Sequence, residues 1–348
     1  MKMPLRSSLR NLALYLACLC VCLGPARSWG AEKIVKIKLA TIVPTGSSYH
    51  KSLLKMRDKW RQASGGAVDV VIYEGNKAGG EAETIGLMQA DQLQASLLSV
   101  VGLSEIEPAV AGLQTMPMAF ETLDEVDYVG EKLRPMLEKR LLEKGYVVLF
   151  WTDAGWVRFF STKPVVHPDD LKKLKLFTWA GNAAEVESYK AAGMNPVPLE
   201  TADVVPGFTT GLIEAIPMPP FAVLGAQIDT KARHMLELNW APLVGALVIT
   251  RKAWDRIPDN MKDALRAAAV EAGKENKAAG RADSEESVKR MKQRGLIVHE
   301  VTPEIEAEWR KMVESSSHLI RGKIVPADIY DEAQRLIKEY RAGNRTAK

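Results

Sequence analysis

Segments with the pattern of buried strands alternate with helical segments, and this alternation stops near Asp153 and then begins again. Val35, Ile37 and Leu39 alternate with lysines, which is the period of a half-buried strand. Strands that alternate with helices are typical of an α/β fold with a largely parallel sheet. The chain is therefore predicted to be an α/β protein, with strands at 35–39, 67–73, 93–98, 146–151, 157–161, 175–178, 212–217 and 247–250.

The interruption near Asp153 and a second one at Trp240-Ala241-Pro242 divide this pattern into two domains. A chain of 348 residues also exceeds the usual size of a single core. We predict a first domain made of residues 31–153 together with 242–258, and a second domain made of residues 154–241. Because the chain crosses between the domains twice, the connection is predicted to be a hinge of at least two strands, which suits closure around a ligand.

The end of the chain is predominantly helical. Residues 259–294 are almost uninterrupted helix formers, and Gly295 is a natural stop. At a rise of about 1.5 Å per residue this helix would extend roughly 50 Å, which is enough to brace both domains. We predict that Gly280 or Asp283-Ser284 kinks or splits it. Residues 295–348 are predicted to form two amphipathic helices that pack on the domains.

Residues 1–30 have the composition of a cleaved secretory signal peptide. A basic start is followed by an apolar run, Leu12 to Leu23, that is too short to span a bilayer and ends before Pro25. This leader has no acidic residue, and its basic residues account for the whole formal net charge of +4. The remaining chain is formally neutral, which removes the main argument for nucleic-acid binding. All three cysteines lie in the leader, so we predict an exported protein without disulfides.

The sequence offers few groups for catalysis. Its five histidines have no metal-ligand spacing. No Gly-x-Ser-x-Gly, Gly-x-Gly-x-x-Gly or phosphate-loop pattern occurs. We therefore predict no catalytic residue, no metal and no cofactor, and an α/β scaffold with a hinge favours binding over turnover. The acidic residues that an enzyme could use are not paired by their spacing: Glu81, Glu83, Asp203 and Glu214.

Several linked segments carry a resemblance to a known family. They are Gly79-Gly80-Glu81 with the helix that follows, Met116 to Phe120, Arg158 to Pro164 with Pro168 to Lys175, Met194 to Pro198 with Gly211 to Glu214, and Trp254 with Ile257-Pro258 and the long helix. Each segment is weak alone, but their order and spacing cover most of the chain. On these segments the chain resembles the periplasmic solute-binding subunits of tripartite ATP-independent periplasmic (TRAP) transporters, the DctP-like family.

The resemblance implies a periplasmic-binding-protein fold of the venus-flytrap type, in which hinge strands and a long bracing helix join two α/β domains. It also implies capture of a small organic acid in the periplasm. The ligand would be delivered to a TRAP permease, composed of a small and a large integral membrane subunit, for uptake driven by an ion gradient. The alternative is a periplasmic ligand-sensing module or an enzyme on the same fold.

The resemblance places a binding site around Arg158, which corresponds to an arginine in the family's cleft. Its guanidinium group offers a fork of donors that matches a carboxylate, although an ion pair between the domains would also explain the residue. The family's second carboxylate-binding arginine is expected after Leu176, and here that position is Phe177. The predicted ligand-binding residues are Arg158, Phe177, Trp179, Asn182, Met218, Phe221, Trp240 and Glu81.

The phenylalanine at position 177 leaves two descriptions of the ligand open. In the first, which we favour, the ligand is an organic acid more apolar or aromatic than a C4-dicarboxylate. Arg158 then binds its acid group, and its body is covered by Phe177, Trp179, Met218 and Phe221. In the second, the ligand has no carboxylate, and it is stacked, or held as a cation, by Trp156, Trp179 and Trp240.

Overall fold

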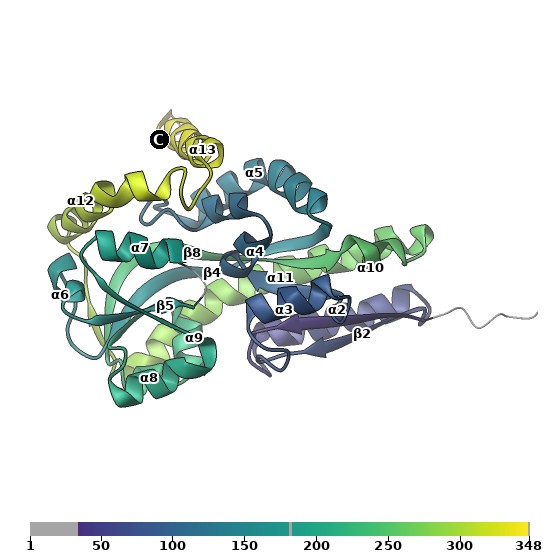
Figure 1. The fold of residues 1–348 in the computed structure, drawn as a ribbon, viewed down its shortest axis with the longest axis horizontal. Coiled ribbons are helices and arrows are strands. Elements are labelled where there is room, and N and C mark those ends of the chain that lie inside the picture. The colour runs from purple at the N-terminus through teal and green to yellow at the C-terminus, as the bar shows by residue number, and fades with distance from the viewer. Residues whose placement is uncertain (1–33, 181–182, 347–348) are drawn as a thin grey trace, which may run out of the picture. The chain divides into compact units, whose positions relative to one another are not determined.

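A single mixed sheet with helices on both faces organises the protein (Figure 1). The computed structural model describes residues 34–180 and 183–346, so the predicted signal peptide lies outside the described residues. Within them, nine strands form the sheet in the order β2-β1-β3-β8-β4-β7-β5-β6, with β9 beside β8. Strands and helices alternate along most of the chain. The α/β prediction is therefore confirmed.

The strands are β1 (Val35–Thr41), β2 (Val68–Tyr73), β3 (Ala95–Ser99), β4 (Tyr146–Ser161), β5 (Lys175–Trp179), β6 (Asn195–Leu199), β7 (Ala215–Met218), β8 (His234–Thr250) and β9 (Ile297–His299). The α-helices are α2 (Ser48–Ala63), α3 (Glu81–Gln89), α4 (Val100–Ile106), α5 (Leu123–Glu143), α6 (Pro168–Lys172), α7 (Ala183–Ala191), α8 (Val204–Thr210), α9 (Pro220–Gly225), α10 (Arg251–Asp255), α11 (Asp259–Gln293), α12 (Pro303–Ile320) and α13 (Ala327–Thr346). Short 3-10 helices occupy Pro108–Leu113, Thr201–Asp203 and Ile228–Thr230.

The sheet has two parallel halves on either side of an antiparallel centre. In the first half, β1 pairs in parallel with both β2 and β3. In the second half, β5 pairs in parallel with both β6 and β7. Between the halves, β8 and β4 lie antiparallel to each other, β8 is antiparallel to β3, and β4 is antiparallel to β7. The short strand β9 pairs with β8 in parallel. The sheet is therefore parallel in its flanks, as predicted, but not through its centre.

The two central strands are longer than the sequence indicated. The segments predicted as 146–151 and 157–161 are one strand, β4, and the predicted break before Pro242 lies inside β8. The prediction of separate strands was wrong because a register shift between Asp153 and Trp156 absorbs the irregularity, with Gly155 at a φ of 75°. Pro242, which has no N–H to donate, pairs with Trp156 just beyond this bulge. Both strands therefore run through both halves of the sheet.

Helix α11 is the long helix that the sequence predicted, and it packs against α2, β4 and α9. The predicted split is wrong, because the helix continues through Gly280 and Ser284 without interruption. These small residues instead allow close packing. A Cβ added at Gly273 would lie 2.6 Å from the Cβ of Phe150, and one at Gly280 would overlap the hydroxyl of Tyr49.

We expect Gly280→Ala to destabilise the protein by about 1–3 kcal/mol, because the added methyl group overpacks the contact with Tyr49. The matched control is Gly130→Ala in α5, where nothing lies within 4 Å of the added Cβ. That change should stabilise the protein by about 0.5–1 kcal/mol, because alanine is the better helix former. Urea denaturation of both variants measures the difference, and equal effects would contradict the close packing of α11.

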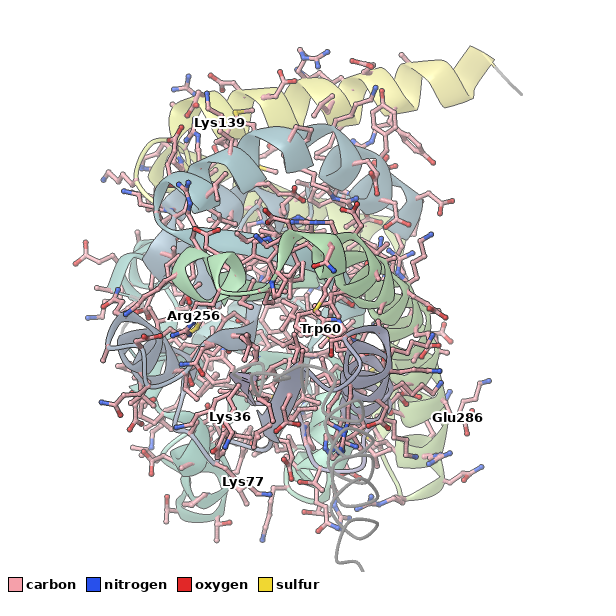
Figure 2. The ribbon with its side chains drawn as sticks, turned by 90° about the vertical axis from the view of Figure 1, so that its right-hand side faces the viewer. Lys36, Trp60, Lys77, Lys139, Arg256 and Glu286 are labelled. Carbon is pink, nitrogen blue, oxygen red and sulfur yellow. The ribbon has the colours of Figure 1, made fainter. Side chains whose placement is uncertain are left out.

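Buried apolar residues form clusters on both faces of the sheet. On one face of the sheet, α5 and α13 cover the first half, and α12 and α7 cover the second half. Figure 1 shows α5 next to α13 and α12 next to α7. The opposite face is covered by α2, α8, α9 and α11. Trp60 is fully buried there and donates to the carbonyl of Leu265 at 2.9 Å, whereas Lys139 and Glu286 lie at the periphery (Figure 2).

Candidate functional site

The carboxyl ends of the parallel strands mark where a ligand is expected, because open α/β sheets bind ligands beyond those ends. The first and second halves of the protein approach each other in the segments that follow those ends. Tyr49 in α2 and Phe221 in α9 stack with their ring centroids 5.7 Å apart. A carboxylate oxygen of Glu200, after β6, lies 3.8 Å from the position that a Cβ would take at Gly80, the N-cap of α3.

Arg158 lies in the part of β4 that pairs with β7, where its partner in the register is Met218. Only 7% of its surface is exposed. Its Nε and Nη1 atoms are buried and have no hydrogen-bond partner among the described residues. A buried donor without an acceptor normally costs stability, and more so when the group is charged. Arg158 is therefore a buried cation with hydrogen-bonding capacity left to satisfy.

Two carboxylates lie near this guanidinium group without forming hydrogen bonds to it. Nη1 is 3.8 Å from Glu237 of β8, and Nη2 is 3.6 Å from Glu285 of α11. Both glutamates are largely exposed, with 46% and 66% of their side-chain surface open to solvent. Solvent screening makes such contacts weak, so they balance the charge of Arg158 but do not satisfy its donors.

Met218 and Phe221, two of the predicted wall residues, follow each other closely at the end of β7. Met218 is half-buried and packs against the apolar cluster of the second half. Phe221 is half-buried in the first turn of α9 and stacks on Tyr49 with an interplanar angle of 14°. The register thus brings Met218 next to Arg158, and Phe221 lies three residues further along the chain.

Phe177 and Trp179 lie two positions apart on β5, so their side chains are on the same face of the strand. Their rings contact each other edge to face, with the ring centroids 4.8 Å apart. Phe177 is fully buried in the core of the second half, whereas Trp179 at the end of the strand is only half-buried. In this arrangement the ring of Phe177 supports Trp179 from the core side. Asn182 lies outside the described residues.

Trp240 packs in a different cluster from the other predicted site residues. The residue is 5% exposed, and its ring centroid lies 5.0 Å from that of Phe159 and 6.0 Å from that of Trp309. Trp156 is also buried, in the core cluster on the α5 side of the sheet. Both indoles are thus committed to packing in this conformation, and of the three tryptophans in the second ligand description only Trp179 is partly exposed.

Glu81 binds the backbone of its own half rather than open space. One carboxylate oxygen accepts a hydrogen bond from the amide of Ser99 at 2.6 Å, and the other accepts from the hydroxyl of Ser99 at 2.6 Å and from the amide of Gly102 at 3.1 Å. Burial raises the pKa of Glu81, and the bonds from Ser99 and Gly102 counteract part of that effect. Glu81 therefore fixes the start of α4.

Sequence reasoning missed a charged network at the bulge of β4. Arg281 of α11 donates to both carboxylate oxygens of Asp153, at 2.8 and 2.7 Å, and to both of Asp127, at 3.1 and 2.7 Å. Ser284 donates to the carbonyl of Ala154 at 2.9 Å. Burial alone would raise the pKa of Asp127, but the bonds from Arg281 and Lys277 outweigh burial and lower it. In the sequence, this network was indicated only by the presence of small and charged residues together on the predicted helix 259–294.

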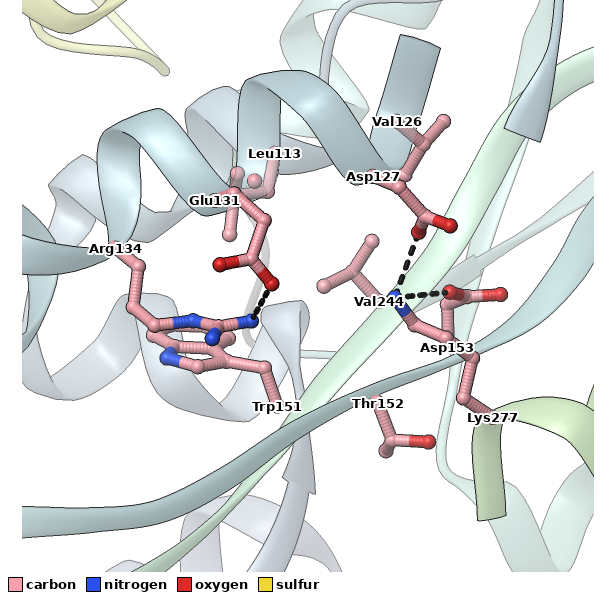
Figure 3. A pocket seen from close by; sticks show the side chains of 11 residues that line it. Leu113, Val126, Asp127, Glu131, Arg134, Trp151, Thr152, Asp153, Val244 and Lys277 are labelled. Atoms are coloured by element: carbon pink, nitrogen blue, oxygen red, sulfur yellow. Dashed lines mark hydrogen bonds and ion pairs between the residues drawn. The ribbon is translucent and has the colours of Figure 1, made fainter. Parts of the chain in front are cut away.

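A small cavity borders this network (Figure 3). Lys277 lies between Asp127 and Asp153, with its Nζ 2.6 and 3.8 Å from their carboxylates, and Arg134 pairs with Glu131 beside Trp151. The cavity volume is about 30 Å³, which leaves room for one or two water molecules but not for an organic acid. This cavity is therefore not the ligand site.

Residues 39–320 match the family model described as bacterial extracellular solute-binding protein, family 7 (DctP). The chain belongs to this family. It is thus a periplasmic solute-binding subunit of the TRAP type, as the resemblance predicted, and it is a binding protein and not an enzyme.

Relatives and solved structures of the DctP family agree over most of the chain. The C4-dicarboxylate-binding periplasmic protein DctP of Rhodobacter capsulatus is 23% identical over 81% of this chain and 85% of its own. A TRAP solute-binding protein from Ralstonia eutropha H16, with bound acetolactate, has a TM-score of 0.80, with 20% identity, and covers 88% of this chain and 99% of that one. One from Chromohalobacter salexigens, with bound D-glucuronate, has a TM-score of 0.79, with 20% identity, and covers 87% and 99%.

These neighbours establish the two-domain fold of TRAP periplasmic binding proteins, so the predicted venus-flytrap fold is confirmed. Among the described residues of this DctP-family protein, no helix is long and apolar enough to cross a membrane. The same residues contain no group of three or more histidine, cysteine or acidic side chains arranged to bind a metal ion. Arg158 is, in the same part of the chain, a buried arginine with two nitrogen atoms that have no hydrogen-bond partner.

Proposed function

We propose that this TRAP solute-binding subunit captures a small organic acid that is more apolar or aromatic than a C4-dicarboxylate. The observation that carries the proposal is the guanidinium group of Arg158, which is buried and has two nitrogen atoms without hydrogen-bond partners. A carboxylate supplies two acceptor oxygens at the spacing of the guanidinium fork. The acid group of the ligand would accept hydrogen bonds from the donors of Arg158 that have no partner in the protein itself.

Known relatives support an acid as the ligand class. Of the three proteins described above, one is a C4-dicarboxylate-binding protein and two were solved with bound acetolactate or D-glucuronate, and all of these ligands contain a carboxylate. This chain has one arginine at the site and Phe177 in place of the second. With a single guanidinium fork, one carboxylate of the ligand is bound strongly and the rest of the molecule meets other side chains.

The neighbours of Arg158 favour an apolar body for that ligand. Met218 is its partner in the register, and Phe221 and Trp179 are half-buried at the ends of neighbouring strands of the second half. Such walls with few polar anchors are typical of small-molecule sites. The second description, a ligand without a carboxylate, is less well supported because Trp156 and Trp240 are packed in the core.

We further propose the domain division 31–153 with 242–258, and 154–241, with the long helix 259–294 and the helices of 295–348 packing on both. The crossing of β4 and β8 between the halves supports it, because the bulge at Asp153 to Trp156 lies at the proposed boundary. Residues 1–30 would be removed on export to the periplasm. The loaded protein would then deliver its ligand to the small and large subunits of a TRAP permease, whereas a sensor would lack that partner.

The test begins with native mass spectrometry of the purified protein, which detects a co-purified ligand by its mass. A thermal-shift panel follows, with phenylacetate and phenylacetamide as a matched acid and amide, and with succinate, D-glucuronate and choline. A ligand at about 100 times its Kd stabilises a protein by about 2.7 kcal/mol. We expect aromatic acids to stabilise the protein and the amide to have no effect. Equal stabilisation by amide and acid, or by choline alone, would contradict the proposal.

A further inference from the structure

We propose that Tyr49 and Phe221 form a latch between the two halves of the protein and thereby act as positioning residues for ligand capture. Tyr49 belongs to α2, which packs on β2 of the first half, and Phe221 belongs to α9, which follows β7 of the second half. Their rings stack at 5.7 Å and 14° although 172 positions separate them in the sequence. The inference rests on solute binding by a two-domain protein and not on the ligand class.

Tyr49 is fixed on its own side of the latch. It is 5% exposed, and its hydroxyl donates to the carbonyl of Asp153 at 2.7 Å, in the bulge of β4. Gly280 of α11 leaves room for that hydroxyl only because it has no Cβ. The bulge is itself bound to α11 by Arg281 and Ser284. Because these contacts hold both the hydroxyl group of Tyr49 and the bulge to which it is bound, we expect the ring of Tyr49 to stay in place when Phe221 moves.

Phe221 is connected to the ligand anchor by a short, stiff segment. Met218 is the register partner of Arg158, and only Pro219 and Pro220 separate it from Phe221. Each proline ring restricts its own φ, so this segment has little conformational freedom. A displacement of the end of β7, where the proposed ligand would contact Met218, therefore reaches Phe221 directly. The stack couples the ligand site to the relative position of the two halves.

The expected consequence is a change in an equilibrium rather than in a ligand contact. A stacked aromatic pair should favour the latched arrangement over an open one by about two- to tenfold. A latch of this kind acts before any ligand is present, because it alters the population of the binding-competent arrangement. Because Phe221 also belongs to the proposed apolar wall of the ligand site, the latch is measured as the arrangement of the two halves without ligand and not as a ligand affinity.

The experiment measures the separation of the halves in the full chain without ligand. Cys18, Cys20 and Cys22 are replaced by serine, and spin labels are attached at Lys51→Cys in α2 and Val205→Cys in α8, both of which are exposed. Double electron–electron resonance then gives the distribution of distances. We expect Phe221→Ala to shift the distribution toward longer separations by about two- to tenfold in population. An unchanged distribution would overturn the latch.

Phe221→Tyr is the matched control, because it keeps an aromatic ring at the position. We expect it to retain the distribution of the unsubstituted protein, and a shift as large as that of Phe221→Ala would show that stacking is not the cause. Circular dichroism and thermal unfolding of each variant verify that it is folded. Since no ligand is present, a negative result would leave the role proposed for Arg158 unaffected.

Discussion

Replacing Arg158 by alanine should weaken binding of the acid that stabilises the protein most in the thermal-shift panel by about 100-fold or more. Hydrogen bonds to charged groups contribute roughly 1.5–3 kcal/mol each, and a carboxylate on a guanidinium fork makes two of them. Every 1.4 kcal/mol is about a factor of ten in Kd. Isothermal titration calorimetry on the wild type and on Arg158→Ala measures the change, and an unaltered Kd would remove Arg158 from the site.

The stability of the same variant separates the two explanations of Arg158. If the residue is a ligand anchor, Arg158→Ala should change the free energy of unfolding without ligand by only about 1 kcal/mol, because its partners Glu237 and Glu285 are exposed and it has unmade hydrogen bonds. If it is an ion pair between the domains, removing it should cost several kcal/mol. Arg158→Lys keeps the charge without the fork and should bind with intermediate affinity.

The fold could be predicted from the sequence where periodicity and stop signals are local. The strand–helix alternation and the long helix from Asp259 onward were both found at or close to their predicted positions. The continuity of β4 and β8 was missed, because Gly155 and Pro242 resemble strand breakers. Only the pairing of the two strands reveals that a bulge accommodates both residues.

The candidate site depends on contacts and burial that local sequence patterns do not determine. Arg158 and Met218 are neighbours through strand pairing, and a resemblance to a family was needed to single out the arginine. Phe177 and Trp179 lie two positions apart on one strand, yet the first is fully buried and the second is partly exposed at the strand end. Depth along a strand is set by the helices that cover it, so sequence alone could not separate them.

That difference in depth also indicates what an arginine introduced at position 177 would do. Phe177 is packed among apolar residues, so Phe177→Arg would bury an unpaired charge. The variant would be destabilised, so its ligand preference could not be measured.

Contacts between residues from distant parts of the chain could not be predicted from the sequence either. Tyr49 and Arg281 meet Asp153 across 104 and 128 positions, and no local pattern marks such contacts.

Arg281→Ala should be among the most destabilising single substitutions outside the ligand site. Asp153 has only 3% of its side chain exposed, and it loses two hydrogen bonds when Arg281 is removed. Removing one partner of a buried ion pair typically costs about 3–5 kcal/mol. Lys277 remains 3.8 Å from Asp153 and offsets part of that loss, so we expect a decrease of about 2–3 kcal/mol in the free energy of unfolding.

The control and the pH dependence make this prediction specific to the network. Arg290→Ala removes an exposed arginine of the same helix, paired with Glu286, and should cost less than about 0.5 kcal/mol.

The pKa of Asp127 is lowered in the folded protein, so Asp127 takes up its proton at a higher pH in the unfolded chain than in the folded one. The stability that this carboxylate contributes above about pH 4 is therefore lost as the pH falls below that value. Arg281→Ala weakens this shift, so urea denaturation should show a shallower acid dependence in the variant. Equal stability of Arg281→Ala and Arg290→Ala would mean that the bulge of β4 does not depend on α11, and Tyr49 would then lack the fixed support that the latch requires.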